Sequence, residues 1–282
     1  MAGAAPGQAA AIGGGGAVMA ARETRLTLWQ GRIETEVEIR GSGPPVVYLH
    51  GPWGVSADAS FLDRLAESHT VYAPKHPGTS TGQSAAIHAL DDWWDLILYH
   101  GELFDRLELS APPLVGHSYG GMVAAELAAA DPRIRKLVLI DPLGLWHEEL
   151  PVKNWMIMSD DQRRTSLFAD PKGDAAQRFL SFPNEPKARV AAQVDFVWSQ
   201  ACTGKFVWPI PDKGLKKHTH RIAASTLILW GKADGIIAPA YAEEFAHRIK
   251  NTRIELIDGA GHLPHLEAGD KVARSVRSFL GA

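Results

Sequence analysis

The sequence contains very little cysteine. Cys202 is the single cysteine among 282 residues. One thiol cannot form a disulfide within the chain, and it cannot supply the set of thiolates that a structural zinc site needs. The composition therefore excludes a disulfide-rich fold and indicates a reducing compartment, which we expect to be the cytoplasm.

The sequence also lacks an excess of positive charge. It has 29 lysines and arginines against 32 aspartates and glutamates, for a formal net charge of -3. Basic residues cluster only in pairs such as Arg163-Arg164 and Lys216-Lys217. Because nucleic-acid binding depends on a basic surface that neutralises phosphates, we expect no nucleic acid among the partners.

Long apolar runs are absent as well. No segment of the sequence stays apolar over the roughly 20 residues that a membrane-spanning helix needs. The first residues have neither the basic start nor the solid apolar centre of a secretory signal. We therefore expect neither a signal peptide nor a membrane partner.

Residues 1–22 are small and almost uncharged, and they include four consecutive glycines at positions 13–16. Such a composition cannot bury enough apolar surface to offset the entropy of ordering. We predict a disordered tail rich in Gly and Ala, within which Met19 is an alternative start.

From Thr24 onward, short apolar segments alternate with segments of helical pattern. Two segments around Gln30-Gly31 alternate apolar and polar residues, which predicts an antiparallel hairpin at the edge of a sheet. Continuous apolar runs follow, namely PPVVYLHG, HTVYAPKHPG, PPLVGHS, KLVLIDP, TLILWG and RIELIDG. Strands of this kind, separated by helices, are typical of a parallel sheet covered on both faces. The predicted fold class is therefore α/β, with a mostly parallel sheet.

The alternation stops between residues 143 and 222. This interval has no clear strand, but large apolar side chains are frequent in it. They are Trp146, Trp155, Met156, Met158, Phe168, Phe179, Phe182, Phe196, Trp198 and Trp208. A connection of this length usually has structure of its own. We predict a helical cap over 143–222, inserted into a core domain formed by 23–142 and 223–282, and expect about a third of these side chains to face a ligand pocket.

Ser118 lies in the stretch LVGHSYGG, which has the pattern G-x-S-x-G. It follows a run that predicts a strand and precedes an alanine-rich run that predicts a helix. This strand-turn-helix setting distinguishes a nucleophile elbow from a chance match. Gly116 and Gly120 leave space where the sharp turn brings backbone segments together. Ser118 is therefore the candidate nucleophile.

A serine hydroxyl at neutral pH needs a base to take its proton and an acid to orient that base. Asp234 follows the run TLILWG, and His262 follows RIELIDG. The order Ser, Asp, His is found with this kind of elbow, and the carboxyl ends of parallel strands meet at one edge of a sheet. We expect the three side chains to converge there. Asp141 stays an alternative to Asp234, and His117 and His265 stay alternatives to His262.

Together these motifs resemble the α/β-hydrolase fold family, in its branch with a cap inserted after the sixth strand. The resemblance extends from about Thr24 to the C-terminus and rests on LHGPWG, APKHPGTSTGQS, GHSYGG, LWGKADGIIAP and GAGHLPHLE. It implies Ser118 as the nucleophile, His262 as the general base and Asp234 as the acid that orients the base.

The resemblance also implies an oxyanion hole made of backbone N–H groups. One is the N–H of Tyr119, directly after the nucleophile, and the other comes from the loop after His50-Gly51. Family members commonly use the residue directly after that pair, which here is Pro52 and has no N–H. We therefore expect Trp53 to donate.

A second departure lies in the stretch APKHPG, where Lys75 replaces the acidic residue usual in the family. That position supports the geometry of a loop, so we expect a local change there and no loss of chemistry. We interpret His50 as a residue that braces a loop.

The sequence predicts a hydrolase without a cofactor that cleaves a small or medium, largely apolar ester or lactone through an acyl-enzyme. A carbon–carbon bond hydrolase of ring-cleavage diketones is an alternative, although no arginine can be assigned to a substrate carboxylate. A ligand-binding protein without turnover is another, because fold does not fix function. His218 and His220 lack partners at metal-ligand spacing, so we expect no metal. The sequence leaves open whether the chain forms a homodimer.

Overall fold

A computed structural model describes residues 21–208 and 212–281 of the chain. Most of the predicted tail, including Met19, lies outside these residues, and strand β1 already includes Arg22, the last residue of that tail. The strands are β1 (Arg22–Leu28), β2 (Ile33–Arg40), β3 (Pro45–Leu49), β4 (Thr70–Pro74), β5 (Leu114–His117), β6 (Lys136–Ile140), β7 (Ser225–Gly231) and β8 (Thr252–Ile257).

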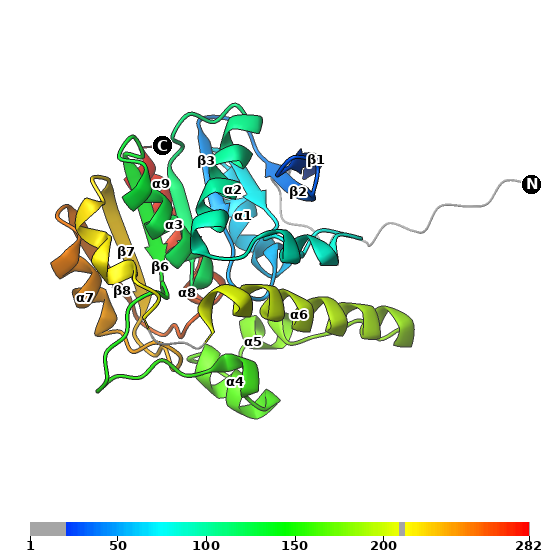
Figure 1. The fold of residues 1–282 in the computed structure, drawn as a ribbon. Helices are drawn as coiled ribbons and strands as arrows, with labels where there is room; N and C mark the ends of the chain where they lie inside the picture. The colour runs from blue at the N-terminus through cyan, green and yellow to red at the C-terminus, as the bar shows by residue number, and fades with distance from the viewer. Residues whose placement is uncertain (1–20, 209–211, 282) are drawn as a thin grey trace, which may run out of the picture.

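These strands form one sheet of eight strands in the order β1-β2-β4-β3-β5-β6-β7-β8. β1 pairs antiparallel with β2, and β2 pairs antiparallel with β4. From β4 across to β8 all pairs are parallel. The structure confirms the α/β class, the mostly parallel sheet and the hairpin around Gln30-Gly31 (Figure 1).

Helices cover both faces of this sheet, as predicted. On one face, α1 (Ala59–Ala66) and α9 (Gly269–Leu280) pack on the sheet around a first apolar cluster. On the other face lie α2 (Trp93–Arg106), α3 (Tyr119–Ala130) and α7 (Tyr241–Arg248), around a second and larger cluster. Figure 1 shows these two layers on either side of the strands.

Strand β3 illustrates why the parallel strands consist of continuous apolar runs. Val46 and Tyr48 belong to one apolar cluster, whereas Val47 and Leu49 belong to the other. Successive side chains of a strand point to opposite faces, so a strand covered on both faces must be apolar at every position. The only polar side-chain atom of β3 is the hydroxyl oxygen of Tyr48, and this hydroxyl donates a hydrogen bond to Oδ2 of Asp58 at 2.7 Å.

Between β6 and β7 the described residues contain helices and no strand. These helices are α4 (Asp160–Leu167), α5 (Asp174–Phe179) and α6 (Pro186–Val207). They fall inside the interval 143–222 that the sequence predicted as a helical cap. Figure 1 shows the three helices together beyond one end of the sheet.

Helix α6 is held against the core by hydrogen bonds near its C-terminal half. The indole N–H of Trp198 donates to the carbonyl of Gly78 at 2.8 Å. The ammonium of Lys205 donates to the carbonyl of Ile87 at 3.0 Å. At the other end Glu185 accepts hydrogen bonds from the first N–H groups of the helix, which satisfies donors that the helix itself leaves free.

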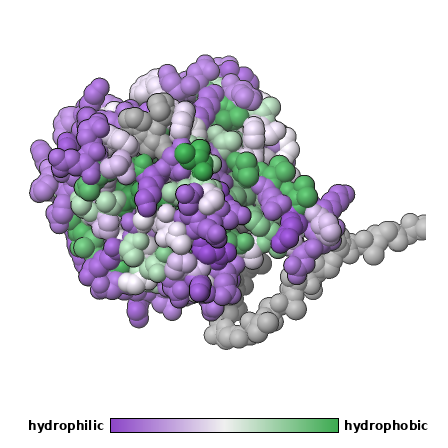
Figure 2. All heavy atoms as spheres, turned by 90° about the horizontal axis from the view of Figure 1, so that it is seen from below, coloured by the Kyte–Doolittle hydropathy of each residue, from purple (hydrophilic) through white to green (hydrophobic). Residues whose placement is uncertain are grey.

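The side of α6 that faces solvent carries apolar side chains. Val190, Val194 and Val197 are exposed, and their spacing places them on one side of the helix. Viewed from the side of α4, α5 and α6, the surface shows apolar patches between polar residues (Figure 2). Because α6 carries apolar side chains on its outer side and toward the core, its sequence has no clear helical period.

Candidate active site

Ser118 lies in the turn between β5 and α3, fully buried. Its backbone has φ 52° and ψ -115°, a combination of angles that residues other than glycine rarely adopt. Its N–H donates to the carbonyl of Ile140 at 2.9 Å, and its carbonyl accepts the N–H of Leu143 at 3.0 Å. Strain that the surrounding hydrogen bonds maintain in this way is found mostly at functional sites.

The two glycines of the G-x-S-x-G pattern are required by close backbone contacts. A Cβ on Gly120 would lie 2.0 Å from the carbonyl oxygen of Leu49. A Cβ on Gly116 would lie 2.4 Å from the carbonyl oxygen of Gly120. Leu49 belongs to β3 and Gly120 to α3, so neither carbonyl can move without moving one of these elements, and any larger residue would displace the turn that holds Ser118.

Ser118, His262 and Asp234 form a continuous line of hydrogen bonds. The Oγ of Ser118 lies 2.9 Å from Nε2 of His262, and Nδ1 of His262 lies 2.8 Å from Oδ2 of Asp234. All three side chains are removed from solvent. A carboxylate only accepts, so Nδ1 of His262 carries the hydrogen and Nε2 accepts the hydroxyl of Ser118. The structure thus brings the three predicted residues together.

Asp234 is held in place by several donors besides His262. Its Oδ1 accepts the N–H groups of Ile236 and Ile237 at 2.8 and 2.9 Å. Its Oδ2 also accepts the indole N–H of Trp230 at 3.2 Å. These bonds fix the carboxyl group in the position from which Oδ2 meets His262.

Asp141, the alternative acid, lies beside Asp234 and His262. Its Oδ1 accepts the N–H of Gly231 at 2.9 Å, and its Oδ2 has no hydrogen-bond partner among the described residues. Burial, and then the negative charge of Asp234, raise the pKa of Asp141 well above its usual value. The carboxylate that accepts the hydrogen bond from Nδ1 of His262 is that of Asp234.

The two alternative histidines make other contacts. His117 donates from Nε2 to the carbonyl of His262 at 2.9 Å. His265, in the short helix α8 (Pro264–Glu267), pairs through Nε2 with Asp58 at 2.8 Å. Burial, followed by the nearby His265 and His262, lowers the pKa of His117 well below its ordinary value. Among the three histidines, only His262 meets the serine.

The two residues predicted for the oxyanion hole both lie near the serine, Tyr119 directly after it in the chain and Trp53 against His262. Tyr119 is the first residue of α3, where backbone N–H groups have no acceptor within the helix and the helix dipole favours negative charge. Trp53 lies in the turn after β3, and its ring packs edge-on against His262 at 5.9 Å between centroids. Both residues are buried next to the hydrogen-bonded line.

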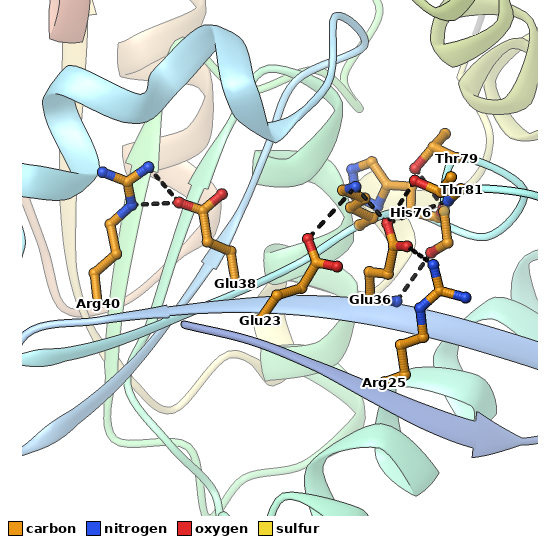
Figure 3. A network of polar contacts seen from close by, with 10 residues as sticks. Glu23, Arg25, Glu36, Glu38, Arg40, His76, Thr79 and Thr81 are labelled. Carbon is orange, nitrogen blue, oxygen red and sulfur yellow. Dashed lines mark hydrogen bonds and ion pairs between the residues drawn. The ribbon is translucent and has the colours of Figure 1, made fainter. Parts of the chain in front are cut away.

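Lys75 is matched by a carboxylate from another strand. Glu36 of β2 contacts both Lys75 and Arg25, and it accepts hydrogen bonds from the N–H and the hydroxyl of Thr81 at 3.2 Å (Figure 3). Burial opposes ionisation of Glu36, but the bonds from Lys75 and Thr81 prevail, so its pKa is lowered. The loop after β4 is therefore tied to β2 by an acid that the sequence places far from position 75.

His50 braces the neighbouring loop, as the sequence suggested. Its Nε2 accepts the N–H of His76 at 3.2 Å, and its Nδ1 donates to the carbonyl of Gly51 at 2.7 Å. In return, Nε2 of His76 donates to the carbonyl of His50 at 2.7 Å. Burial lowers the pKa of His50 to about 4, so the ring stays neutral and holds the two loops together.

A cavity of about 730 Å³ lies between these loops and the helices α5 and α6. Its walls combine aromatic rings, hydroxyl groups, two cations and one acid. The aromatic residues are Trp53, Phe179, Phe182, Phe196 and Trp198, the hydroxyls include Ser56, Thr79, Ser181 and Ser199, and the charged residues are Lys75, Arg178 and Asp195. Of the ten apolar side chains noted in 143–222, four line this cavity, close to the expected third.

The ring of Trp53 contacts both this cavity and His262. Phe179 also lines the cavity, and its ring packs edge-on against that of Trp53 at 5.6 Å. Sequence analysis did not single out Phe179 from the other aromatic residues of 143–222. No local signal marks it, because its position depends on how α5 meets the core.

Two buried groups in the described part of the chain bring three metal-ligand atoms within 4.8 Å of one another. They are Asp58 with His117 and His265, and Asp141 with Asp234 and His262. In each group a histidine and a carboxylate are hydrogen-bonded at 2.8 Å, which accounts for their closeness. His218 contacts Glu126.

Among the described helices, none is both long and apolar enough to span a bilayer.

Comparison with known proteins identifies relatives over most of the chain. The model of the family described as "Alpha/beta hydrolase family" matches residues 46–275. The chain is 26% identical over 280 residues to a 2-hydroxy-6-oxo-2,4-heptadienoate hydrolase of Pseudomonas putida, covering 89% of this chain and 94% of that protein. It is 26% identical over 261 residues to a pimeloyl-[acyl-carrier protein] methyl ester esterase of Xanthomonas campestris, covering 87% of this chain and 98% of that protein.

Solved structures share the fold. An esterase from Exiguobacterium antarcticum superposes with a TM-score of 0.74 at 22% identity, covering 93% of this chain and 100% of that one. At this level of identity the likeness concerns the fold alone.

Proposed function

Because the chain belongs to the alpha/beta hydrolase family, we propose that it is a serine hydrolase in which Ser118 is the nucleophile, His262 the general base and Asp234 the acid that orients the base. The observation that carries this proposal is the unbroken line from Oγ of Ser118 through His262 to Oδ2 of Asp234, with distances of 2.9 and 2.8 Å. These side chains supply a nucleophile and a proton acceptor, so the proposed reaction uses no cofactor.

In the first half of the reaction, Oγ of Ser118 attacks the substrate carbonyl carbon while Nε2 of His262 takes the hydroxyl proton. The carbonyl oxygen becomes an oxyanion, which the backbone N–H groups of Tyr119 and Trp53 stabilise. Asp234 stabilises the imidazolium that forms. His262 then gives its proton to the leaving alcohol, and the acyl group stays on Ser118.

In the second half, water attacks the acyl-enzyme and His262 takes one of its protons. The same two N–H groups stabilise the second oxyanion. Collapse of this intermediate breaks the bond to Oγ of Ser118, which recovers its proton from His262. The products are a carboxylic acid and an alcohol.

Residues 143–222 act in this proposal as a cap over the core domain formed by 23–142 and 223–282. Helices α5 and α6 contribute the outer wall of the cavity, and loops of the core contribute the inner wall. The mixed wall fits a small or medium ester or lactone with an apolar body and a polar end. The esterase relative supports ester cleavage.

Carbon–carbon bond cleavage is the second candidate function. Its support is the similarity to a 2-hydroxy-6-oxo-2,4-heptadienoate hydrolase along nearly the full length of both chains. Arg178, which lines the cavity, provides a cation that the carboxylate of such a substrate would need. The same serine and histidine serve in this reaction, so the substrate distinguishes the two functions.

The proposal is tested with p-nitrophenyl esters of increasing acyl length and with a ring-cleavage diketone, using the wild type and Ser118→Ala. We expect loss of at least about a thousandfold in kcat/KM in Ser118→Ala, because the residue forms the covalent bond. A fluorophosphonate should label the wild type and not the variant. Ser275→Ala, which removes a hydroxyl on α9 that bonds Glu255, is the control and should keep full activity. Equal rates in the wild type and Ser118→Ala would favour a ligand-binding protein instead.

A further inference from the structure

The mechanism above leaves the buried carboxyl group of Asp141 without a role, although it lies directly beside Asp234. Asp141 follows β6 and Asp234 follows β7, and the two strands are neighbours in the sheet. An oxygen of each carboxyl group and a nitrogen of His262 all lie within 4.8 Å of one another. Water reaches neither carboxyl group. Two buried carboxyl groups this close cannot both be ionised without strong repulsion.

The hydrogen bonds around the pair decide which carboxyl group is ionised. Asp234 accepts two backbone N–H groups on Oδ1 and the N–H groups of His262 and Trp230 on Oδ2. Asp141 accepts one N–H, that of Gly231, on Oδ1. Donors stabilise the charged form of a carboxyl group. The negative charge therefore resides on Asp234.

The unpartnered oxygen of Asp141 indicates where the proton is. Oδ2 of Asp141 is fully buried and has no hydrogen-bond partner among the described residues. As a carboxylate oxygen it would be an unsatisfied charged acceptor, which is costly in the protein interior. As a hydroxyl it would be a donor, and the neighbouring acceptor is Asp234.

Asp234 can accept this further donor. Trp230 shares its N–H between Oδ2 of Asp234 and the carbonyl of Ile237, at 3.2 Å each. Such a three-centre bond uses an acceptor only in part. The carboxylate of Asp234 therefore has room for a hydrogen bond from its neighbour.

We propose that Asp141 is a neutral carboxylic acid at neutral pH, and that its Oδ2–H donates a hydrogen bond to the carboxylate of Asp234. The two residues share one negative charge and one proton. Asp141 is then a positioning residue that acts on His262 only through Asp234. This positioning role rests on the proposed function, whereas the protonation of Asp141 does not.

The other titratable groups around the pair agree with this assignment. His262 faces it from the loop after β8, and Glu267 of α8 adds a negative charge at longer range. No lysine or arginine forms an ion pair with Asp141 in residues 21–208 or 212–281. Burial and the charge of Asp234 are the main causes that raise the pKa of Asp141.

The protonated carboxyl group can be observed directly by infrared spectroscopy of the purified protein. At pH 7 the carbonyl stretch of a protonated carboxylic acid should be present in the wild type and weaker in Asp141→Asn. Asp131→Asn is the matched control, because Asp131 is paired with Arg133 at the surface and its pKa is lowered. This control should leave the protonated-acid signal unchanged.

The pH dependence of kcat/KM on a p-nitrophenyl ester gives the second readout. Asn is neutral and keeps a donor, so the acidic limb of the pH profile of Asp141→Asn should lie at the same pH as in the wild type. If Asp141 were ionised, its replacement would remove a negative charge next to Asp234 and His262. The acidic limb would then move to lower pH by about one unit or more.

An unchanged infrared signal in Asp141→Asn, or a shifted acidic limb, would overturn the proposal. If Asp141→Asn does not fold, Asp234→Asn provides the test. Removing the neighbouring charge should make the Asp141 signal disappear at a lower pH than in the wild type, and an unmoved signal would contradict the shared proton. A wild type without esterase activity would overturn the proposed function and leave the infrared result valid.

Discussion

At the scale of single residues, the buried histidines make the stability of the fold depend on pH. His50 and His100 are fully buried, and burial lowers the pKa of each to about 4. In the unfolded chain a histidine takes up its proton near pH 6.5. Below that pH the unfolded state therefore binds more protons than the folded state, and the free energy of unfolding decreases as the pH falls toward 4.

His100→Phe should reduce this loss. The ring of His100 packs against Tyr99, Phe104 and His76, and Nδ1 donates to the carbonyl of Leu96, its one hydrogen-bond partner among the described residues, so phenylalanine can take its place. Between pH 7 and pH 5 we expect the wild type to lose about 2 kcal/mol more unfolding free energy than the variant. Urea denaturation across this range measures the difference. Equal losses of unfolding free energy in the two proteins would contradict a neutral His100. Between pH 7 and pH 8 the difference in unfolding free energy between the two proteins should stay constant.

The backbone of Ser118 leads to a second prediction at this scale. Its φ of 52° and ψ of -115° strain any residue that has a Cβ, and glycine adopts such angles at little cost. We expect Ser118→Gly to be inactive and yet about 1 kcal/mol more stable than Ser118→Ala. Thermal unfolding of the two inactive variants makes the comparison, and a less stable glycine variant would contradict it.

Sequence patterns predicted Ser118 and the order of its partners, and the structure places the three side chains within hydrogen-bond distance. Sequence analysis chose Asp234 and kept Asp141 as an alternative, because both follow strands that are neighbours in the sheet. Their roles differ through the donors that each one receives. The pairing of Lys75 with Glu36 could not be predicted either, since Lys75 lies in the loop after β4 and Glu36 lies on β2.

At the scale of elements, strands were easier to predict than the helices of 143–222. A strand buried on both faces is a continuous apolar run, which a sequence displays directly. Helix α6 instead carries exposed valines on its outer side and aromatic residues on its inner side. Its boundaries depend on contacts with loops of the core, which are far away in sequence.

One of these contacts can be removed without changing the shape of α6. Trp198→Phe keeps an aromatic ring and removes the hydrogen bond to the carbonyl of Gly78. We expect a loss of about 1 kcal/mol and faster amide hydrogen exchange in the C-terminal half of α6, with exchange in α3 unchanged. Trp94→Phe, at a side chain that is 64% exposed on α2, is the control. Unchanged exchange in Trp198→Phe would show that this bond does not hold α6.

At the scale of the whole molecule, the sheet with its two helical layers holds the proposed catalytic residues, and the helices α5 and α6, inserted between β6 and β7, lie beside the cavity. The sheet and its two helical layers position Ser118, Asp234 and His262 from different strands. The helices α5 and α6 decide the shape of the cavity beside them. Substrate preference can therefore change by substitution in 143–222 while the chemistry of the core stays the same.

The complete burial of Ser118 and His262 has a consequence for the whole cycle. In this arrangement neither side chain touches bulk water, and the ring of Trp53, which also packs on Phe179, lies against His262. For Ser118 to act as proposed, the side chains that cover it must move to admit a substrate and move again to release the products.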